Sequence, residues 1–181
     1  GIIPVHMAGY PCNMRAIKKI CQENDLILIE DCAHSIGSIF ENKHVGTFGK
    51  SGCFSFYPTK QITTGEGGIV ISNDGDFIEK INQLKAFGID TSPEKRTKPG
   101  FYDVRNLGYN YRMTDFQAAL GFGQMQRYDF NLKKRKENAK LYFELLSGEN
   151  NLIFNKINKD CSYFLYQINL KDSIRSCYFE S

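Results

Sequence analysis

Residues 26–31 read LILIED, a continuous apolar run that ends abruptly in two carboxylates, Glu30 and Asp31. A continuous apolar run of this length is typical of a parallel strand that is buried on both faces. The carboxyl ends of such strands form the edge at which open α/β sheets bind their ligands. The sequence therefore predicts a sheet that delivers Asp31 to a functional edge.

Strands and helices alternate on both sides of this run. The expected elements are strands at residues 2–6, 53–57 and 68–72 and helices at residues 14–21 and 74–87. Alternation of this kind predicts an α/β domain, which we place at residues 1–125. Between Gly88 and Gly108 the periodicity is lost, and a surface loop of that length is often functional.

The remainder of the chain starts with two helices. Thr114-Asp-Phe-Gln117 has the pattern of a capping box, which opens a helix that runs through Met125. A highly charged helix follows at residues 129–146, and its basic run, residues 133–136, is expected to face solvent.

A polar joint at residues 150–160 then leads to residues 163–170, which look like the first strand of a second unit. We place the connecting helix and the start of a small C-terminal domain at residues 126–181.

The composition excludes several classes of partner. Lys and Arg number 23 and Asp and Glu 20, which gives a formal charge of +3 and no case for nucleic acid or an anionic membrane. No stretch approaches the roughly 20 apolar residues that cross a bilayer. The start, Gly1 to His6, has no initiator Met and no signal-like region, so we expect the true N-terminus to lie upstream.

The six cysteines argue against a metal site. They stand at positions 12, 21, 32, 53, 161 and 177 without any C-x-x-C pair, and the chain has only 3 histidines. Their irregular spacing, mostly beside apolar segments, favours small buried thiols in a reducing cytoplasm over disulfides.

Three groups of residues converge on the strand ends. Asp31 is followed by His34 in the turn after its strand. A second strand contains Ser55 and is followed by Lys60, and a glycine-rich turn at residues 63–68 leads into the next strand. A carboxylate, a lysine and a phosphate-binding hydroxyl are the set that pyridoxal phosphate needs: the lysine forms a Schiff base, the acid keeps the pyridinium nitrogen protonated, and donors hold the phosphate. The P-loop and G-x-G-x-x-G patterns are absent, which disfavours nucleotide hydrolysis and Rossmann-type hydride transfer.

Each of these residues also has a structural explanation when taken alone. An Asp that closes a strand is often a helix N-cap, and a lysine after a strand is usually solvated. His34 could be a satisfied core histidine, and the glycines could serve only a tight turn.

Three segments together resemble one family. IEDCAHSIGS, VGTFGKSGCFSFYPTKQITTGEGGIVISND and LGYNYRMTDFQAALG are similar, in this order, to motifs of the DegT/DnrJ/EryC1/StrS sugar aminotransferases. The likeness extends over about residues 4–170. It implies the large domain of a fold type I enzyme, similar to aspartate aminotransferase, with a mixed, mostly parallel sheet, followed by the start of a small α+β domain.

The resemblance also implies roles for single residues. Lys60 resembles the Schiff-base lysine, which then moves a proton between substrate and cofactor, and Asp31 resembles the partner of the pyridinium nitrogen. His34 matches the position that bonds the phenolic oxygen of the ring, and Ser55 matches a phosphate ligand. Asn110 matches an asparagine that reaches the phosphate of the neighbouring subunit, so a homodimer with shared active sites is expected.

The reaction that the resemblance implies is amination of a keto group on a nucleotide-linked sugar, with glutamate as the donor, for amino sugars of surface polysaccharides. Relatives that remove a hydroxyl carry histidine at the lysine position, so Lys60 favours transamination. The alternatives are an aminotransferase acting on a keto-cyclitol and a catalytically inactive, truncated cofactor-binding or interaction module. We expect the 181-residue chain alone to be inactive and poorly soluble, because open sheet edges and bare apolar faces promote aggregation.

Overall fold

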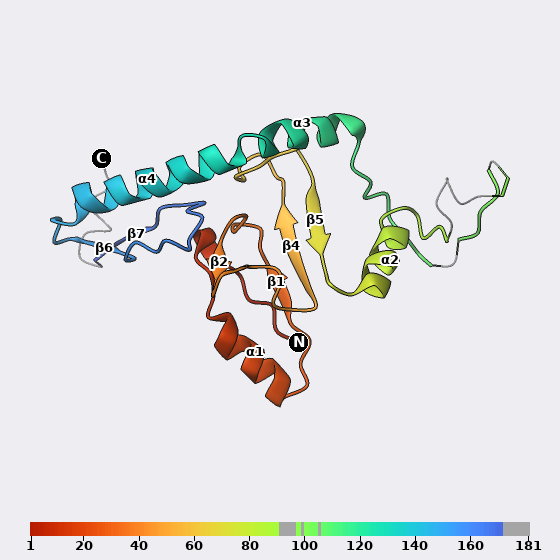
Figure 1. Cartoon of the computed structure of the whole chain (residues 1–181), viewed down its shortest axis with the longest axis horizontal. Coiled ribbons are helices and arrows are strands. Elements are labelled where there is room, and N and C mark those ends of the chain that lie inside the picture. Colours follow the sequence, from red (N-terminus) through yellow and green to blue (C-terminus); the bar gives the residue numbers. More distant parts are fainter. Residues whose placement is uncertain (91–96, 99, 105, 172–181) are drawn as a thin grey trace.

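The computed structural model describes residues 1–90, 97–98, 100–104 and 106–171 (Figure 1). Its elements are η1 (Met7–Gly9), α1 (Met14–Glu23), β1 (Ile29–Asp31), β2 (Ile39–Phe40), β3 (Lys43–His44), β4 (Ser51–Ser55), β5 (Gly68–Ile71), α2 (Gly75–Leu84), α3 (Asp115–Met125), α4 (Tyr128–Leu146), β6 (Leu152–Phe154) and β7 (Ile168–Leu170).

The main sheet has the order β1-β4-β5, with β1 and β4 parallel and β5 antiparallel. Residues 2–5 run parallel to β1 on its other side, through bridges at Leu28 and Asp31. The predicted mixed, mostly parallel sheet is therefore confirmed.

The strand predicted at residues 26–31 is displaced along the sequence. The apolar run lies mostly ahead of β1, whose last two residues are the carboxylates Glu30 and Asp31. The Leu26 N–H still donates to the carbonyl of Cys21 in the last turn of α1, and Ile27 is exposed, so regular pairing with β4 starts only at Ile29. Asp31 nevertheless stands at the carboxyl end, as expected.

A small hairpin, β2–β3, was not expected. Its turn residues, Glu41 and Asn42, both have positive φ angles, 49° and 63°. Such a turn is usually marked by Asn-Gly or Asp-Gly. Without a glycine the turn gives no recognisable signal in the sequence.

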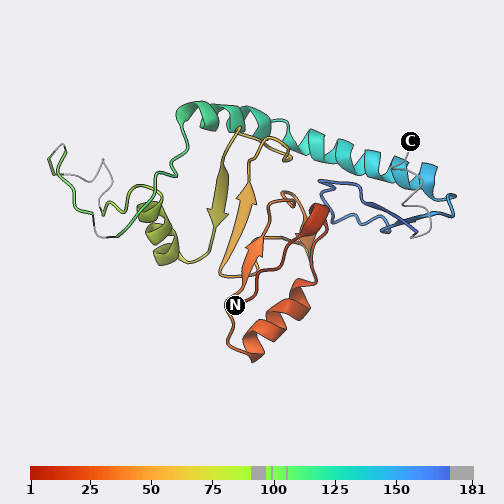
Figure 2. The same ribbon diagram turned by 180° about the vertical axis from the view of Figure 1, so that it is seen from behind.

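Side-chain caps mark the starts of three helices. Asn13 and Asp74 accept hydrogen bonds from backbone N–H groups at the starts of α1 and α2, and Thr114 and Gln117 form the predicted capping box of α3. Figures 1 and 2 show α3 and α4 running across the sheet edge at which β1 and β4 end, with α1 toward the opposite edge.

The C-terminal strand prediction is only partly correct. Of the predicted strand, only Ile168–Leu170 pairs, as β7, antiparallel to β6. β6 itself lies inside residues 150–160, which were expected to be a polar joint. Residues 161–163 are buried, and Tyr163, where the predicted strand begins, has a φ of 48° and is not extended. This segment packs against the N-terminal region, with Cys161 and Tyr163 in a cluster with Ala139 of α4.

The basic run of α4 is only partly solvated. Lys134 pairs with Glu137, but Arg135 donates to the carbonyls of Tyr163 and Phe164, each at 3.4 Å, and Lys136 donates to that of Lys159 at 2.7 Å. The basic side chains therefore fix the C-terminal segment against α4.

Several large apolar side chains are exposed. Phe116 at the start of α3 is 91% exposed and Leu107 is 85% exposed. These surfaces give the predicted poor solubility of the chain alone a physical basis, and that behaviour stays a prediction. Among the described helices none is long and apolar enough to span a membrane.

Some predictions fall outside the described residues. They concern residues 91–96, 99 and 105 of the expected long loop, the tail 172–181, and Cys177 within it. The five described cysteines are free, and three of them are buried.

Candidate active site

Asp31 and Ser55 lie on one face of the sheet. Asp31 ends β1, and its register partner on parallel β4 is Cys53, two residues before Ser55. Because side chains alternate between faces along a strand, Asp31, Cys53 and Ser55 point to the same side. The Asp31 Oδ1 accepts the Ala33 N–H at 3.0 Å, so the side chain shapes its own turn and caps no helix.

Lys60 and His34 join Asp31 at this edge. Burial lowers the pKa of His34, the Lys60 ammonium lowers it further, and the Asp31 carboxylate opposes both. The His34 ring and the Lys60 Nζ both lie against the ring of Phe164, and Asp31 ends β1 three residues before His34, so the three groups form one cluster at this edge. The cluster places a carboxylate, an imidazole and an amine together, as the sequence predicts.

His34 is not a satisfied core histidine. Its Nδ1 is buried and has no hydrogen-bond partner among the described residues. A buried polar atom without a partner costs free energy unless a ligand or water satisfies it. The atom therefore lacks the partner that a satisfied core histidine would have.

Ser55 can donate a hydrogen bond outward. Its Oγ accepts the Tyr57 N–H at 3.3 Å, which leaves the hydroxyl proton free. The chain then turns, with the Lys60 N–H bonded to the Tyr57 carbonyl at 2.9 Å, and this turn returns Lys60 to the sheet edge.

Phe164 is a member of this cluster that sequence reasoning missed. Its ring lies 4.4 Å from the His34 ring, centroid to centroid, with 33° between the planes. The Lys60 Nζ stands 4.9 Å from the centroid of the same ring. No motif marks Phe164, since residues 163–170 read as an ordinary strand.

Asn110 lies apart from the cluster. It is exposed, forms a bridge with Ala86, and accepts a hydrogen bond from the Arg112 Nε at 3.2 Å. None of its described contacts is with Asp31, His34 or Lys60, so within one chain the five predicted residues do not form one group.

The glycine-rich return is a tight turn tied to α3. Gly65 has a φ of 78°, in the region that favours glycine. The Gln124 side chain accepts from the Thr63 N–H at 3.1 Å and donates to its carbonyl at 3.0 Å. The turn thus fixes α3 beside the lysine segment.

The opposite face of β1 carries a buried polar cluster. Glu30 Oε2 accepts from His6 Nε2 at 3.2 Å and from the Gly46 N–H at 2.7 Å, while Oε1 accepts from the Phe48 and Gly49 N–H groups at 2.7 and 2.9 Å. Burial raises the pKa of Glu30, but these four hydrogen bonds outweigh it and lower the pKa overall.

This cluster resembles a metal site only in composition. Potential ligand atoms of His6, Glu30 and Cys32 lie within 4.8 Å of one another. The His6 Nδ1, however, accepts the Cys12 N–H at 3.0 Å, which leaves its proton on Nε2 to donate to Glu30. The hydrogen bonds thus occupy both His6 nitrogens and both Glu30 oxygens.

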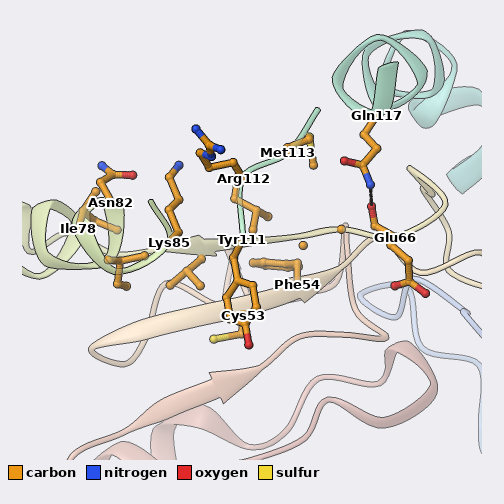
Figure 3. Close-up of a pocket in the computed structure, with 15 residues that line it drawn as sticks. Cys53, Phe54, Glu66, Ile78, Asn82, Lys85, Tyr111, Arg112, Met113 and Gln117 are labelled. Atoms are coloured by element: carbon orange, nitrogen blue, oxygen red, sulfur yellow. Dashed lines mark hydrogen bonds between the residues drawn. The ribbon is translucent and has the colours of Figure 1, made fainter. Parts of the chain in front are cut away.

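A cleft of about 590 Å³ lies elsewhere, between β5, α2 and residues 111–113 (Figure 3). Its lining includes Phe54 and Ile78, and Lys85 and Arg112 point the same way at one rim. None of the five predicted site residues lines it.

Comparison with known proteins agrees with this architecture. The profile of the DegT/DnrJ/EryC1/StrS aminotransferase family matches residues 1–177. The chain is 44% identical over 161 residues to an uncharacterised protein of Methanocaldococcus jannaschii, a match that covers 87% of this chain and 42% of that protein. It is 40% identical over 147 residues to the GDP-perosamine synthase of Vibrio cholerae, with coverage of 81% and 38%.

Solved structures give the same picture. Helicobacter pylori PseC, described as an aminotransferase involved in the biosynthesis of pseudoaminic acid, is similar with a TM-score of 0.90 at 30% identity, over 98% of this chain and 47% of that one. This likeness confirms the predicted fold class. The chain spans about two fifths of the length of the curated relatives named above.

Proposed function

The chain belongs to the DegT/DnrJ/EryC1/StrS aminotransferase family, and from that premise we propose that the protein transfers an amino group, from glutamate, to a keto group of a nucleotide-linked sugar. The proposed cofactor is pyridoxal phosphate, and the proposed product is an amino sugar for surface polysaccharide. Cytoplasmic location is part of the same proposal.

The meeting of Lys60, Asp31 and His34 at the carboxyl edge of β1 and β4 supports this proposal most strongly. An amine, a carboxylate and an imidazole with an unpartnered Nδ1 suit a ligand that offers an electrophilic carbon, a basic ring nitrogen and a ring oxygen. The names of the relatives support a nucleotide-linked sugar as the substrate, because a GDP-perosamine synthase and UDP-aminosugar transaminases are among them.

The residues at the edge fit the cofactor. When bound, pyridoxal phosphate supplies an electron sink. The Lys60 Nζ would hold it covalently and, once released, carry a proton to and from the substrate carbon. The Asp31 carboxylate would accept from the ring nitrogen, the His34 imidazole would bond the ring oxygen, and the Ser55 hydroxyl would donate to the phosphate.

Asn110 belongs to the proposal in a different way. Its exposed position, with a side chain bonded only to Arg112 among the described residues, suits contact with a second subunit. We therefore propose a homodimer in which Asn110 reaches the phosphate bound by the partner.

The test is a visible absorption spectrum of the protein expressed from its whole reading frame with added pyridoxal phosphate. The wild type and Lys60→Ala are compared with Lys43→Ala, which removes an exposed lysine on β3. We expect a visible cofactor band in the wild type and in Lys43→Ala that collapses on adding glutamate, and no such band in Lys60→Ala.

An unchanged band in Lys60→Ala would refute the role of this lysine. No band in any variant would favour the inactive binding module instead. Amination of keto-cyclitols, but of no nucleotide-linked keto sugar, would replace the proposed substrate class while leaving the lysine chemistry intact.

A further inference from the structure

We propose that Phe164 is a positioning residue of the lysine site, whose ring fixes the plane of the His34 imidazole and keeps the Lys60 amine beside it. The catalytic consequence rests on the proposed function, but the packing of the three side chains does not. The segment 161–165 would then be part of the active site although it is more than 95 residues from Lys60 in sequence.

The ring touches both functional side chains. Its centroid lies 4.4 Å from that of His34 and 4.9 Å from the Lys60 Nζ. Offset stacking restricts rotation of an imidazole, and an aromatic face attracts an ammonium group. One ring therefore sets the orientation of His34 and the location of the amine at the same time.

The orientation of the His34 ring has to be fixed by packing, because its Nδ1 has no hydrogen-bond partner among the described residues. That atom is buried, and no described protein group fixes the rotation of the ring from its side. The described ring contact of His34 is the tilted packing, at 33° between planes, against Phe164. Phe164 thus supplies the orientation that a hydrogen bond would otherwise provide.

The backbone around Phe164 is anchored on both sides. From α4, Arg135 Nη1 donates to the carbonyls of Tyr163 and Phe164, each at 3.4 Å. From the lysine segment, Gln61 Nε2 donates to the Ser162 Oγ at 2.8 Å. Gln61 directly follows Lys60, so the anchor couples the ring to the lysine it contacts.

The close approach of this segment is built into the sequence. The Ser162 N–H donates to the Gly9 carbonyl at 3.2 Å, and a Cβ on Gly9 would lie 2.6 Å from the Ser162 Oγ. Tyr163 adopts a φ of 48°, a conformation that costs a non-glycine residue on the order of 1 kcal/mol. Strain of this kind persists only where the surroundings over-determine it, as they do here.

The first measurement uses the cofactor-free protein expressed from its whole reading frame, with ¹³C at the histidine Cε1 positions. In the wild type we expect the His34 signal to carry a ring-current shift and to titrate below its ordinary pKa. Phe164→Leu should remove that shift and raise the pKa of His34, whereas Phe164→Tyr should preserve both. Leu165→Ala changes the neighbouring, half-exposed side chain and serves as the matched control, with no expected change.

The second measurement asks whether the ring acts on catalysis. With kcat expressed per bound cofactor, we expect Phe164→Leu to lower kcat about tenfold, the combined value of one stacking and one cation contact, with the KM for glutamate within about twofold. Phe164→Tyr should restore most of kcat. A residue that only stabilised the fold would change the amount of loaded enzyme and leave kcat per cofactor unchanged.

The outcomes separate the two proposals. A wild-type His34 signal without a ring-current shift, or an unchanged kcat in Phe164→Leu, would overturn the role of Phe164 even in an active aminotransferase. A wild type that shows the ring-current shift but binds no pyridoxal phosphate would overturn the proposed function and leave the packing of Phe164 on His34 supported.

Discussion

Glu30 and Asp31 are neighbours in sequence and opposites in environment. Glu30 points into the protein, where its two oxygens accept four hydrogen bonds from His6, Gly46, Phe48 and Gly49. Asp31 points to the other face of β1, toward an edge where the His34 Nδ1 lacks a partner. The difference teaches that Glu30, whose oxygens have all their hydrogen-bond partners inside the protein, maintains the structure. Asp31, which stands near the unpartnered His34 Nδ1, is positioned for a ligand.

The two clusters also differ in how the chain builds them. The Glu30 face is assembled from segments within the first 49 residues, through a strand, a turn and backbone N–H groups. The Asp31 face needs Lys60 from the β4–β5 connection and Phe164 from the C-terminal segment. The structural cluster is local, and the candidate site depends on distant segments.

The largest expected effect is on the structural face. Gln at position 30 offers one acceptor oxygen in place of two, so Glu30→Gln should leave backbone donors without acceptors and lower the free energy of unfolding by about 4 kcal/mol. Chemical denaturation measures it. Glu41→Gln, which removes an exposed ion pair with Arg15, is the control and should change stability by less than about 0.5 kcal/mol. Equal effects of the two substitutions would contradict the difference between the faces.

The next effect concerns the joint between the N-terminal region and the segment that carries Phe164. Gly9 has a φ of 94°, and a Cβ there would lie 2.8 Å from the Tyr163 nitrogen. We expect Gly9→Ala to cost about 3 kcal/mol, from backbone strain and steric overlap together. Gly123→Ala in α3, where a Cβ meets nothing within 4 Å, should be neutral or slightly stabilising. A tolerated Gly9→Ala would mean that the segment does not pack as described.

A smaller effect is the pH dependence of the Glu30 face. The pKa of Glu30 is lowered in the folded protein, from an ordinary value of 4.5. Its ionisation therefore contributes stability that is fully present above about pH 4.5 and is lost as the pH falls through the lower, folded-state pKa. The stability difference between wild type and Glu30→Gln should shrink below pH 4.5, as followed by denaturation at successive pH values. A difference that grew on acidification would reverse the sign of this coupling.

Local patterns carried much of this architecture. The apolar run before Asp31 located a parallel strand to within a few residues, and Thr114 and Gln117 predicted the capping box that begins α3. Asp31, His34 and Lys60 were singled out by residue type and spacing, and the structure brings them together. Each of these features depends on neighbours within a few residues or on one sheet edge.

Features that depend on distant contacts could not be predicted. The sequence around Glu30 does not indicate that its carboxylate accepts hydrogen bonds from His6 and three backbone N–H groups, because those donors lie in other segments. Phe164 read as a strand residue, because a regular apolar pattern does not reveal that Gln61 and Arg135 hold the backbone around it. The roles of all five predicted site residues, Asp31, His34, Ser55, Lys60 and Asn110, stay predictions.

The most direct test of the two-face account measures unfolding and catalysis together in Asp31→Asn and Glu30→Gln, with the protein expressed from its whole reading frame. We expect Asp31→Asn to keep its free energy of unfolding within about 1 kcal/mol of wild type and to lose about 10³-fold in transamination, since it removes a charge that stabilises the reacting group. Glu30→Gln should show the reverse, with about 4 kcal/mol of lost stability and nearly unchanged activity per bound cofactor. An active Asp31→Asn, or a Glu30→Gln that is stable but inactive, would contradict the account.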